Sequence, residues 1–308
     1  MSETGKKIDV WMVGSIGIDD IETRTASRKN LLGGSLPFAT IAGTFAGMKI
    51  GAVGVVGSDF SSAFSRRWEK FGIDLEGVQR KRGPNFRWAC RYDENMIERT
   101  TLKTELGVFA DFKPELPESY KAASFVLLGN IQPDLQLHVL DQASKPRFVA
   151  LDSMNLWIDT ARPALEQIIA RANLVTLNDG EARQLTGKWN LRDCAADIQA
   201  MGPKYVLIKK GEHGALLFTK KELFIIPAYP VKTLEDPTGA GDTFAGAFIG
   251  YLAKVRIVNT MMLRKSLVFA SAVASFCVEG FSTESLERIT KEDIAKRVFE
   301  LWRMVSIK

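Results

Sequence analysis

The sequence predicts an α/β fold, with helices on both faces of a mostly parallel sheet and a smaller set of strands beside it. Short apolar runs alternate with longer segments of helical periodicity along most of the 308 residues, and this order is typical of parallel strands connected by helices. Two polar stretches, residues 16–32 and 83–109, interrupt the alternation. Strands without intervening helices do not fit a parallel sheet, so these stretches indicate a separate structure.

Six apolar runs are predicted as buried strands, because each is short, β-branched or aliphatic, and bounded by Gly, Asp, Asn or Lys. They span residues 8–13, 50–56, 125–128, 148–151, 174–177 and 205–208. Helices are predicted between them over residues 36–46, 60–71, 134–143, 163–172, 179–185 and 194–201. A helical block over residues 240–253, 260–278 and 291–304 follows.

The two interrupting stretches have their own pattern. Residues 85–92 and 100–106 alternate with a period of two, as half-buried strands do, and residues 16–32 are polar and extended in character. We interpret both as a small β-lid over the end of the main sheet, and a pair of ordinary surface hairpins explains the pattern equally well. Since no repeat, low-complexity tract or linker is visible, residues 1–308 are predicted as a single domain that carries this lid.

The composition is that of a globular protein, with 46% hydrophobic and 25% charged residues. Three separated cysteines offer no disulfide framework and the amino terminus shows no signal-peptide pattern, so a cytoplasmic location is expected. The sequence contains no uninterrupted run of about 18 apolar residues, so we expect no membrane span. The net charge of +5 favours anionic ligands, but the basic runs are short and scattered, which argues against nucleic-acid binding.

Residues 236–249 carry the clearest sign of chemistry. A turn-forming Asp-Pro-Thr leads into Gly239, Ala240 and Gly241, after which an apolar helix begins. Small residues let backbone amides approach a ligand, and the first N–H groups of a helix lack internal partners, so the pattern predicts a phosphate site. Asp242, in the first turn, is expected to accept a proton from an attacking hydroxyl. The alternative is that Asp242 caps the helix and the glycines form a tight turn.

The same residues 236–249 match, position by position, the C-terminal signature of the ribokinase/PfkB carbohydrate kinases. Other motifs that resemble this family follow in its order along the chain. The run that ends at Asp19 is similar to the family's first strand and to the Asp that holds sugar hydroxyls. Gly33 and Gly34 resemble the diglycine that opens the first helix beside the substrate.

Two further motifs resemble the part of the family that handles the nucleotide. Asn178 and Glu181 form an Asn-x-x-Glu motif similar to the one near the phosphates and Mg²⁺. Lys209, Gly211 and Gly214 resemble the strand and glycine turn that contact ATP.

The resemblance implies a fold and a reaction. The fold is a three-layer α/β/α sandwich with a β-lid over the substrate, and the reaction transfers the γ-phosphoryl group of ATP to a primary alcohol of a sugar or sugar-like molecule. Asp242 is then the general base, and the amides of Gly239, Ala240, Gly241 and Asp242 form an anion hole. Glu181 organises Mg²⁺ through water. The resemblance also implies a homodimer through lid edge strands.

The resemblance further implies a monovalent cation, K⁺, held partly by Asp236 and Thr238. The chain departs from the family at two substrate positions, where Phe38 and Gly17 stand in place of asparagines. Two polar contacts to sugar hydroxyls are therefore absent, which argues against ribose as the substrate. Phe38 remains a candidate substrate-binding position, and the protein is expected to take a small-molecule alcohol.

The lid strand leaves three uses open for its side chains. Alternation places Phe86 and Trp88 on one face and Arg87 on the other. An inward aromatic face would stack a nucleobase or an apolar sugar face, whereas an inward Arg87 would clamp an anionic group. Packing within the lid or at a dimer interface is the third use.

Asp152 and Asn155 follow a predicted strand at the sheet edge where ligands of α/β proteins bind. They face the substrate or merely cap the following turn. The sequence as a whole predicts an ATP-dependent carbohydrate kinase. The alternatives are a nucleoside kinase of the same family and a catalytically idle member that only binds its ligand.

Overall fold

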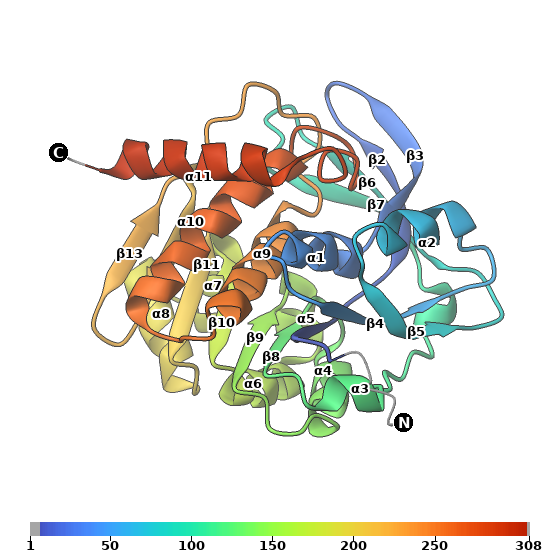
Figure 1. Cartoon of the computed structure of the whole chain (residues 1–308), viewed down its shortest axis with the longest axis horizontal. Helices are drawn as coiled ribbons and strands as arrows, with labels where there is room; N and C mark the ends of the chain where they lie inside the picture. Colours follow the sequence, from blue (N-terminus) through green and yellow to red (C-terminus); the bar gives the residue numbers. More distant parts are fainter. Residues whose placement is uncertain (1–6, 307–308) are drawn as a thin grey trace.

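The computed structural model describes residues 7–306, whose strands form two sheets (Figure 1). Within these residues the larger sheet has nine strands in the order β13-β12-β11-β10-β9-β8-β1-β4-β5. Neighbours pair in parallel from β11 to β5, and antiparallel between β11, β12 and β13. The strands are β1 (Val10–Val13), β4 (Ile50–Val56), β5 (Asp74–Arg80), β8 (Phe125–Leu128), β9 (Phe148–Asp152), β10 (Leu174–Asn178), β11 (Tyr205–Lys209), β12 (Ala215–Phe218) and β13 (Leu223–Ile226).

The six predicted strands are confirmed as β1, β4, β8, β9, β10 and β11. These strands lie inside the sheet, where both faces are covered and nearly every side chain is buried. β5, β12 and β13 lie toward the two edges and were not predicted. An edge strand such as β5 is only partly buried and contains Asp, Glu, Gln and Arg, so it has no continuous apolar run.

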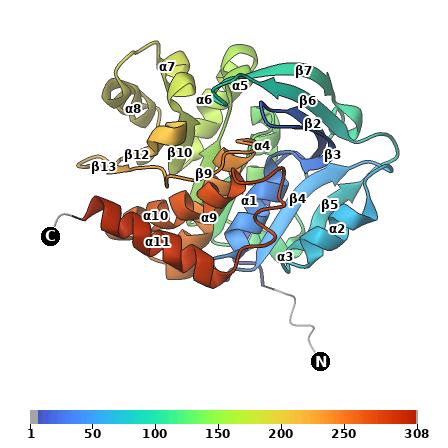
Figure 2. The ribbon, with the colours of Figure 1, turned by 90° about the horizontal axis from the view of Figure 1, so that it is seen from above.

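Helices cover both faces of this sheet (Figure 2), as predicted. Alternate residues of β1 enter two different cores, Val10 and Met12 on one face and Trp11 and Val13 on the other. The first core is closed by α1 (Ser35–Thr44), α2 (Ser62–Glu69), α9 (Ala240–Val255), α10 (Thr260–Cys277) and α11 (Lys291–Val305). The second is closed by α3 (Glu118–Lys121), α4 (Pro133–Asp141), α5 (Asn155–Thr160), α6 (Arg162–Arg171), α7 (Asp179–Thr186) and α8 (Leu191–Ala200).

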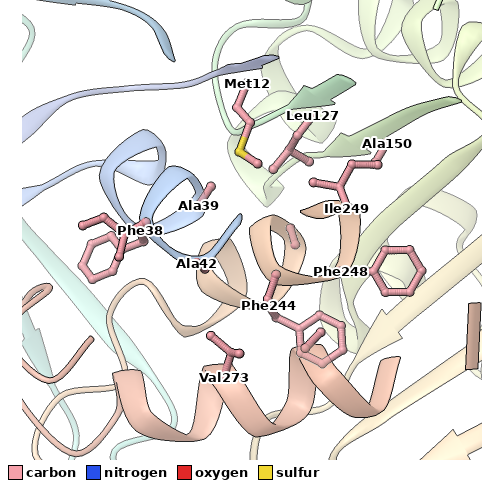
Figure 3. Close-up of a cluster of buried hydrophobic side chains, with 14 of the residues drawn as sticks. Met12, Phe38, Ala39, Ala42, Leu127, Ala150, Phe244, Phe248, Ile249 and Val273 are labelled. Carbon is pink, nitrogen blue, oxygen red and sulfur yellow. The ribbon is translucent and has the colours of Figure 1, made fainter. Parts of the chain in front are cut away.

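Helices α1 and α9 pack directly on one another above the sheet. Figure 3 shows side chains of α1 and α9 meeting Met12, Leu127 and Ala150 from three neighbouring strands. Glycine makes the close approach possible, because a Cβ on Gly246 would lie 2.0 Å from the backbone oxygen of Ala39. This contact fixes the position of α9 and therefore of the turn that precedes it.

Gly246→Ala is expected to destabilise the protein by about 3 kcal/mol, since the added methyl overlaps backbone that cannot rotate away. Thermal unfolding measures the loss as a lower Tm. Gly180→Ala is the matched control, because a Cβ there would approach one side-chain atom, Asn178 Oδ1, at 3.3 Å. Equal Tm values for wild type and Gly246→Ala would contradict the contact.

Helix α10 is long and apolar enough to cross a membrane by length and composition alone, with a mean hydropathy of 1.2 over 18 residues. In the structure 61% of that stretch is buried, and the helix packs against α9 and α11. Buried core helices pass the same test, so its composition is weak evidence for a span.

The two interrupting stretches form one separate sheet, which lies across the end of the larger one (Figure 2). It contains β2 (Gly17–Glu22), β3 (Ser27–Gly33), β6 (Phe86–Tyr92) and β7 (Arg99–Glu105), in the order β3-β2-β6-β7. Since β2 and β6 pair in parallel, the alternative of two independent hairpins is wrong. The free edge strand β7 is exposed along its whole length, and the homodimer through this edge stays a prediction.

Candidate functional site

The polar residues singled out from the sequence gather at one end of the larger sheet. Asp152, Asn178 and Lys209 are the last residues of β9, β10 and β11, three adjacent parallel strands. Carboxyl ends of parallel strands are where α/β proteins bind ligands. The end of α9 that begins at Gly239 lies beside them, since Gly241 approaches Lys209.

The turn into α9 depends on a glycine. Gly239 has φ +77°, and a Cβ there would lie 2.4 Å from the ring of Phe38. It is the N-cap residue and offers no side-chain hydrogen bond. The N–H of Ala240 donates to the backbone oxygen of Pro237 at 3.3 Å, whereas the N–H groups of Gly241 and Asp242 have no backbone acceptor among the described residues and are directed out of the helix end. Asp242 is the third residue of the helix. The alternative that Asp242 serves as the N-cap is therefore wrong.

Phe38 lies beneath this turn. Only 1% of its surface is exposed, and its ring fills the space next to Gly239. We therefore remove Phe38 from the predicted substrate-binding set, because packing under the turn leaves it no surface for a ligand. Its contribution is to hold the backbone of the turn in place.

A buried lysine holds the centre of the site. Lys209 Nζ donates to Asp152 Oδ1 at 2.9 Å, and it would lie 3.1 Å from a Cβ added to Gly241. The side chains are 17% and 7% exposed, so this ion pair is shielded from solvent. Asp152 was predicted either to face the substrate or to cap the following turn, and the structure shows it paired with Lys209.

Burial and neighbouring charges shift the acidic groups. Burial raises the pKa of Asp242 to about 7; the charge of Asp152 adds to this, and the ammonium of Lys209 opposes it. Burial also raises the pKa of Glu181 to about 7, again against the effect of Lys209. The pKa of Lys209 is raised despite its burial, by Asp152 and Glu181, so the lysine remains charged.

Asn178 and Glu181 form a capping box at the start of α7. Asn178 Oδ1 accepts from the N–H of Glu181 at 2.7 Å, and Glu181 Oε2 accepts from the N–H of Asn178 at 2.7 Å. This arrangement fixes the carboxylate of Glu181 near Lys209. Oε1 of Glu181 has no hydrogen bond to the described residues and is the atom that remains for a ligand.

Asp236 supports the turn from below. It is fully buried, its Oδ1 accepts from the N–H of Thr238 at 2.9 Å, and burial raises its pKa. Thr238 in turn shares a hydrogen bond of 3.0 Å with the hydroxyl of Tyr92, on β6 of the smaller sheet. The two sheets are thus connected through the residues before α9.

Asp19 faces this site from the smaller sheet. It is 3% exposed, and its Oδ1 has no hydrogen-bond partner among the described residues. Burial raises its pKa to about 8, although the N–H of Gly34 donates to it and opposes the shift. A Cβ on Gly33 would lie 1.9 Å from Asp19 Oδ2, so the diglycine leaves room for this carboxylate. A buried carboxylate oxygen without a partner requires an explanation, and a ligand hydroxyl that donates to Asp19 would supply one.

Of the three uses left open for β6, packing within the lid is the one that the structure shows: the Phe86 ring lies 5.6 Å from that of Phe109, and Trp88 packs against the buried cluster of the smaller sheet. Stacking of a ligand on Trp88 stays a prediction. Trp88 pairs in register with Asp19, so both side chains lie on the same face of the smaller sheet. Arg87 lies on the opposite face. Its guanidinium donates to Asn30 Oδ1 at 3.2 Å and forms an ion pair with Asp59, with 3.5 Å between Nη2 and Oδ2. We therefore withdraw Arg87 as a substrate-binding residue, because it points away from Asp19 and is already paired.

Sequence reasoning missed Arg99, the first residue of β7. Its guanidinium lies 5.6 Å from the centre of the Trp88 ring, and its charge lowers the pKa of both Asp242 and Glu181. It stands in a strand that is exposed throughout, so no burial pattern marks it. Arg99 pairs with Tyr92 across the smaller sheet, and the hydroxyl of Tyr92 contacts Thr238, a relation that only the structure reveals.

The remaining predicted positions lie around the same end of the sheet. Asn155 is the first residue of α5 and is exposed, and the N-cap of that helix is Met154, so Asn155 does not cap it. Gly211, with φ +52°, belongs to the short 3-10 turn Gly211–His213 after Lys209. Gly214 has φ +86°, and a Cβ there would lie 1.9 Å from the backbone oxygen of Ile226.

Comparison with known proteins gives a consistent result. The family model of the pfkB family carbohydrate kinases matches residues 39–289 of this chain. A cytidine kinase of Thermococcus kodakarensis is 30% identical over 251 residues, which are 79% of this chain and 88% of that protein. A nucleoside kinase of Methanothermobacter thermautotrophicus is 28% identical over 289 residues, which are 91% of this chain and 89% of that protein.

A solved structure shows the same fold. The nucleoside kinase of Methanocaldococcus jannaschii, an archaeal member of the ribokinase family, superposes with a TM-score of 0.77. The match covers 96% of this chain and 100% of that one at 19% sequence identity, so it supports the fold alone.

Proposed function

This chain belongs to the pfkB family of carbohydrate kinases, and from that premise we propose that it transfers the γ-phosphoryl group of ATP to a primary hydroxyl of a nucleoside. The observation that carries the proposal is the position of Asp242, in the first turn of α9 between the Lys209–Asp152 pair and the facing Asp19. A general base, a phosphate site and an alcohol site then lie next to one another.

In the proposed mechanism Asp242 removes the proton from the attacking hydroxyl. The alcohol oxygen forms a bond to the γ-phosphorus, the bond to the bridging oxygen of ADP breaks, and the proton stays on Asp242 until the product leaves. The amides of Gly239, Ala240, Gly241 and Asp242 hold the phosphoryl oxygens at the N-terminus of α9. Positioning and charge stabilisation supply most of the rate in this class of reaction.

The residues present fit Mg²⁺ bound together with ATP. Among residues 7–306 no three His, Cys, Asp or Glu side chains converge on one point, and Mg²⁺ usually keeps its waters and takes only one or two carboxylates beside substrate phosphates. Glu181 has one free oxygen and a fixed orientation for this purpose. The ion would neutralise phosphate charge when it is bound. Lys209, Gly211 and Gly214 are proposed to contact the nucleotide.

K⁺ is part of the same proposal. Asp236 is a buried carboxylate that accepts backbone N–H groups and forms no ion pair with the described residues. A large monovalent cation near Asp236 and Thr238 would balance that charge. It would stabilise the turn that holds the anion hole without taking part in a bond-making step.

Two arguments favour a nucleoside over a simple sugar as the acceptor. The two relatives described above are named as a cytidine kinase and a nucleoside kinase. Independently, Trp88 stands beside Asp19 on the face that looks toward Asp242. An aromatic ring next to a hydroxyl-binding carboxylate suits a base attached to a sugar.

A screen of ATP consumption tests the function. Nucleosides, sugars and polyols are offered with Mg²⁺ and with or without K⁺, and ADP formation is measured. We expect nucleosides to be phosphorylated fastest. Turnover of sugars alone would replace the nucleoside with a sugar, and binding of a ligand without ADP formation would identify a catalytically idle protein.

The activity is expected to fall as the pH is lowered through about 7. Asp242 acts in its ionised form, and because burial raises its pKa to about 7, protonation removes the base below that pH. The ionised form of Glu181, whose pKa is also about 7, is lost over the same range. kcat/KM measured from about pH 5 to 9 should drop at least tenfold per unit on the acid side. A profile that stays flat down to about pH 5 would contradict this role.

A further inference from the structure

The larger sheet does not need the buried ion pair between Lys209 and Asp152 to hold its strands together. β9 and β11 are separated by β10, so the side-chain bond of 2.9 Å spans the last residues of the strand between them. The three strands are already joined by their backbone ladders. A buried ion pair of this kind is weak evidence for stability, since removing two charges from water offsets their attraction.

The ammonium group points to the start of α9. It would lie 3.1 Å from a Cβ on Gly241, so the end of the lysine side chain lies close against the first turn of the helix. The amides that form the predicted anion hole belong to the same residues. Lys209 therefore brings a full positive charge to a helix end that already carries a partial one.

The charges around Lys209 are mostly negative. Asp152, Glu181 and Asp242 all act on it, from β9, α7 and α9. Arg99 of β7 is the other cation that acts on Asp242 and Glu181. When triphosphate charge enters such a site, a fixed ammonium beside the amides is the group that can meet it without rearrangement.

We propose that Lys209 is a catalytic residue that contacts the transferred phosphoryl group beside Gly241, and that Asp152 is the residue that positions it. The proposal rests on the proposed kinase function and goes beyond simple nucleotide binding by Lys209. The lysine stays an ammonium throughout and forms no covalent bond. It donates hydrogen bonds to phosphoryl oxygens whose charge changes as the phosphoryl group moves from ADP to the alcohol.

Lys209→Met tests the first part of the proposal, the contact of Lys209 with the transferred phosphoryl group. Methionine keeps the length of the side chain and removes the charge, and kcat is expected to fall about 10- to 100-fold, the size of a hydrogen bond to a charged group. KM for the acceptor should change little. Lys210→Met, at the next and partly exposed position, is the matched control and should keep wild-type kcat.

The acid side of the pH profile separates this role from a structural one. Loss of the ammonium raises the pKa of Asp242, so Lys209→Met should shift the acid decline to higher pH. Loss of the negative charge of Asp152 lowers the pKa of Asp242, so Asp152→Asn should shift the acid decline to lower pH. Asp19 and Arg99 also act on the group that titrates and are unchanged in both variants. Opposite shifts are not expected from two variants that only loosen the fold.

Asp152→Asn should lower kcat less than Lys209→Met, and the double variant should be no slower than Lys209→Met alone. This non-additivity is expected if Asp152 acts through Lys209. Additive losses would overturn the positioning role. If Lys209→Met does not fold, as a thermal melt would show, the kcat and profile of Asp152→Asn still decide the proposal.

A binding measurement keeps the proposal separate from the identity of the acceptor. Calorimetry compares ADP with ADP plus aluminium fluoride, a mimic of the transferred group. Lys209→Met should lose about tenfold in affinity for ADP plus aluminium fluoride and little for ADP alone. Equal affinities in wild type and variant would overturn the role of Lys209. Failure of the wild type to phosphorylate any alcohol would overturn the kinase function instead.

Discussion

Asp242→Asn is expected to lower kcat by about 100-fold or more, because a positioned general base contributes on the order of 10²–10⁴ to a rate. Asparagine keeps the shape of the side chain at the third residue of α9 and removes the group that accepts the hydroxyl proton. The affinity for ATP is expected not to weaken, since the amides of the turn and Lys209 remain. Initial rates and calorimetric titration with ATP measure the two quantities.

The chain offers a close control for this variant. Asp193 is also the third residue of a helix, α8, and it is exposed. Asp193→Asn loses the same favourable interaction with the helix dipole, about 0.3–1 kcal/mol, and should leave kcat unchanged. A near wild-type kcat for Asp242→Asn would remove Asp242 from the mechanism. Equal losses in both variants would assign the effect to helix stability.

The parts of the fold visible in the sequence are those buried on two sides. β1, β4 and β8 to β11 lie within the sheet and have to be apolar throughout, so their ranges could be predicted. β5, at one edge, has a mixed composition and was missed. β13, at the other edge, is an apolar run of only four residues and was not predicted either. α5 was missed because six residues are too few to show helical periodicity. The parallel pairing of β2 with β6 joins distant segments, and no local pattern encodes it.

The site was predictable where a motif is local and unpredictable where it depends on packing. Asp242, Asp19 and Glu181 belong to short motifs and do meet at one end of the sheet. The contact of Phe38 with Gly239 follows from how α1 packs on α9, which periodicity does not specify. The bond between Asp152 and Lys209 follows from the strand order, because β10 lies between them.

Asp19→Ala is expected to lower kcat/KM for the alcohol by about 100-fold or more and to leave KM for ATP unchanged. The carboxylate is buried with one oxygen unpartnered, so substrate hydroxyls are the donors that it lacks. Above about pH 8, where Asp19 is ionised, a hydrogen bond to this charged group contributes about 1.5–3 kcal/mol, and two of them give a loss of this size. Asp20→Ala is the control, because Asp20 Oδ1 instead accepts from the N–H of Asn30 at 2.8 Å. A selective loss of ATP affinity would contradict this placement.

Stability measurements then show whether Asp19 is held for function. Its pKa is 3.8 when exposed and about 8 in the folded protein, so folding disfavours the ionised form. The wild type therefore loses stability as the pH rises from about 4 to about 8, because over this range Asp19 is ionised in the unfolded chain but stays protonated in the folded protein. Asp19→Asn removes this cost, and its Tm should exceed that of the wild type by a margin that grows over that range. Replacement of a residue that stabilises the fold would instead lower the Tm. A gain in stability together with a loss of substrate binding is expected only of a carboxylate whose partner is the ligand.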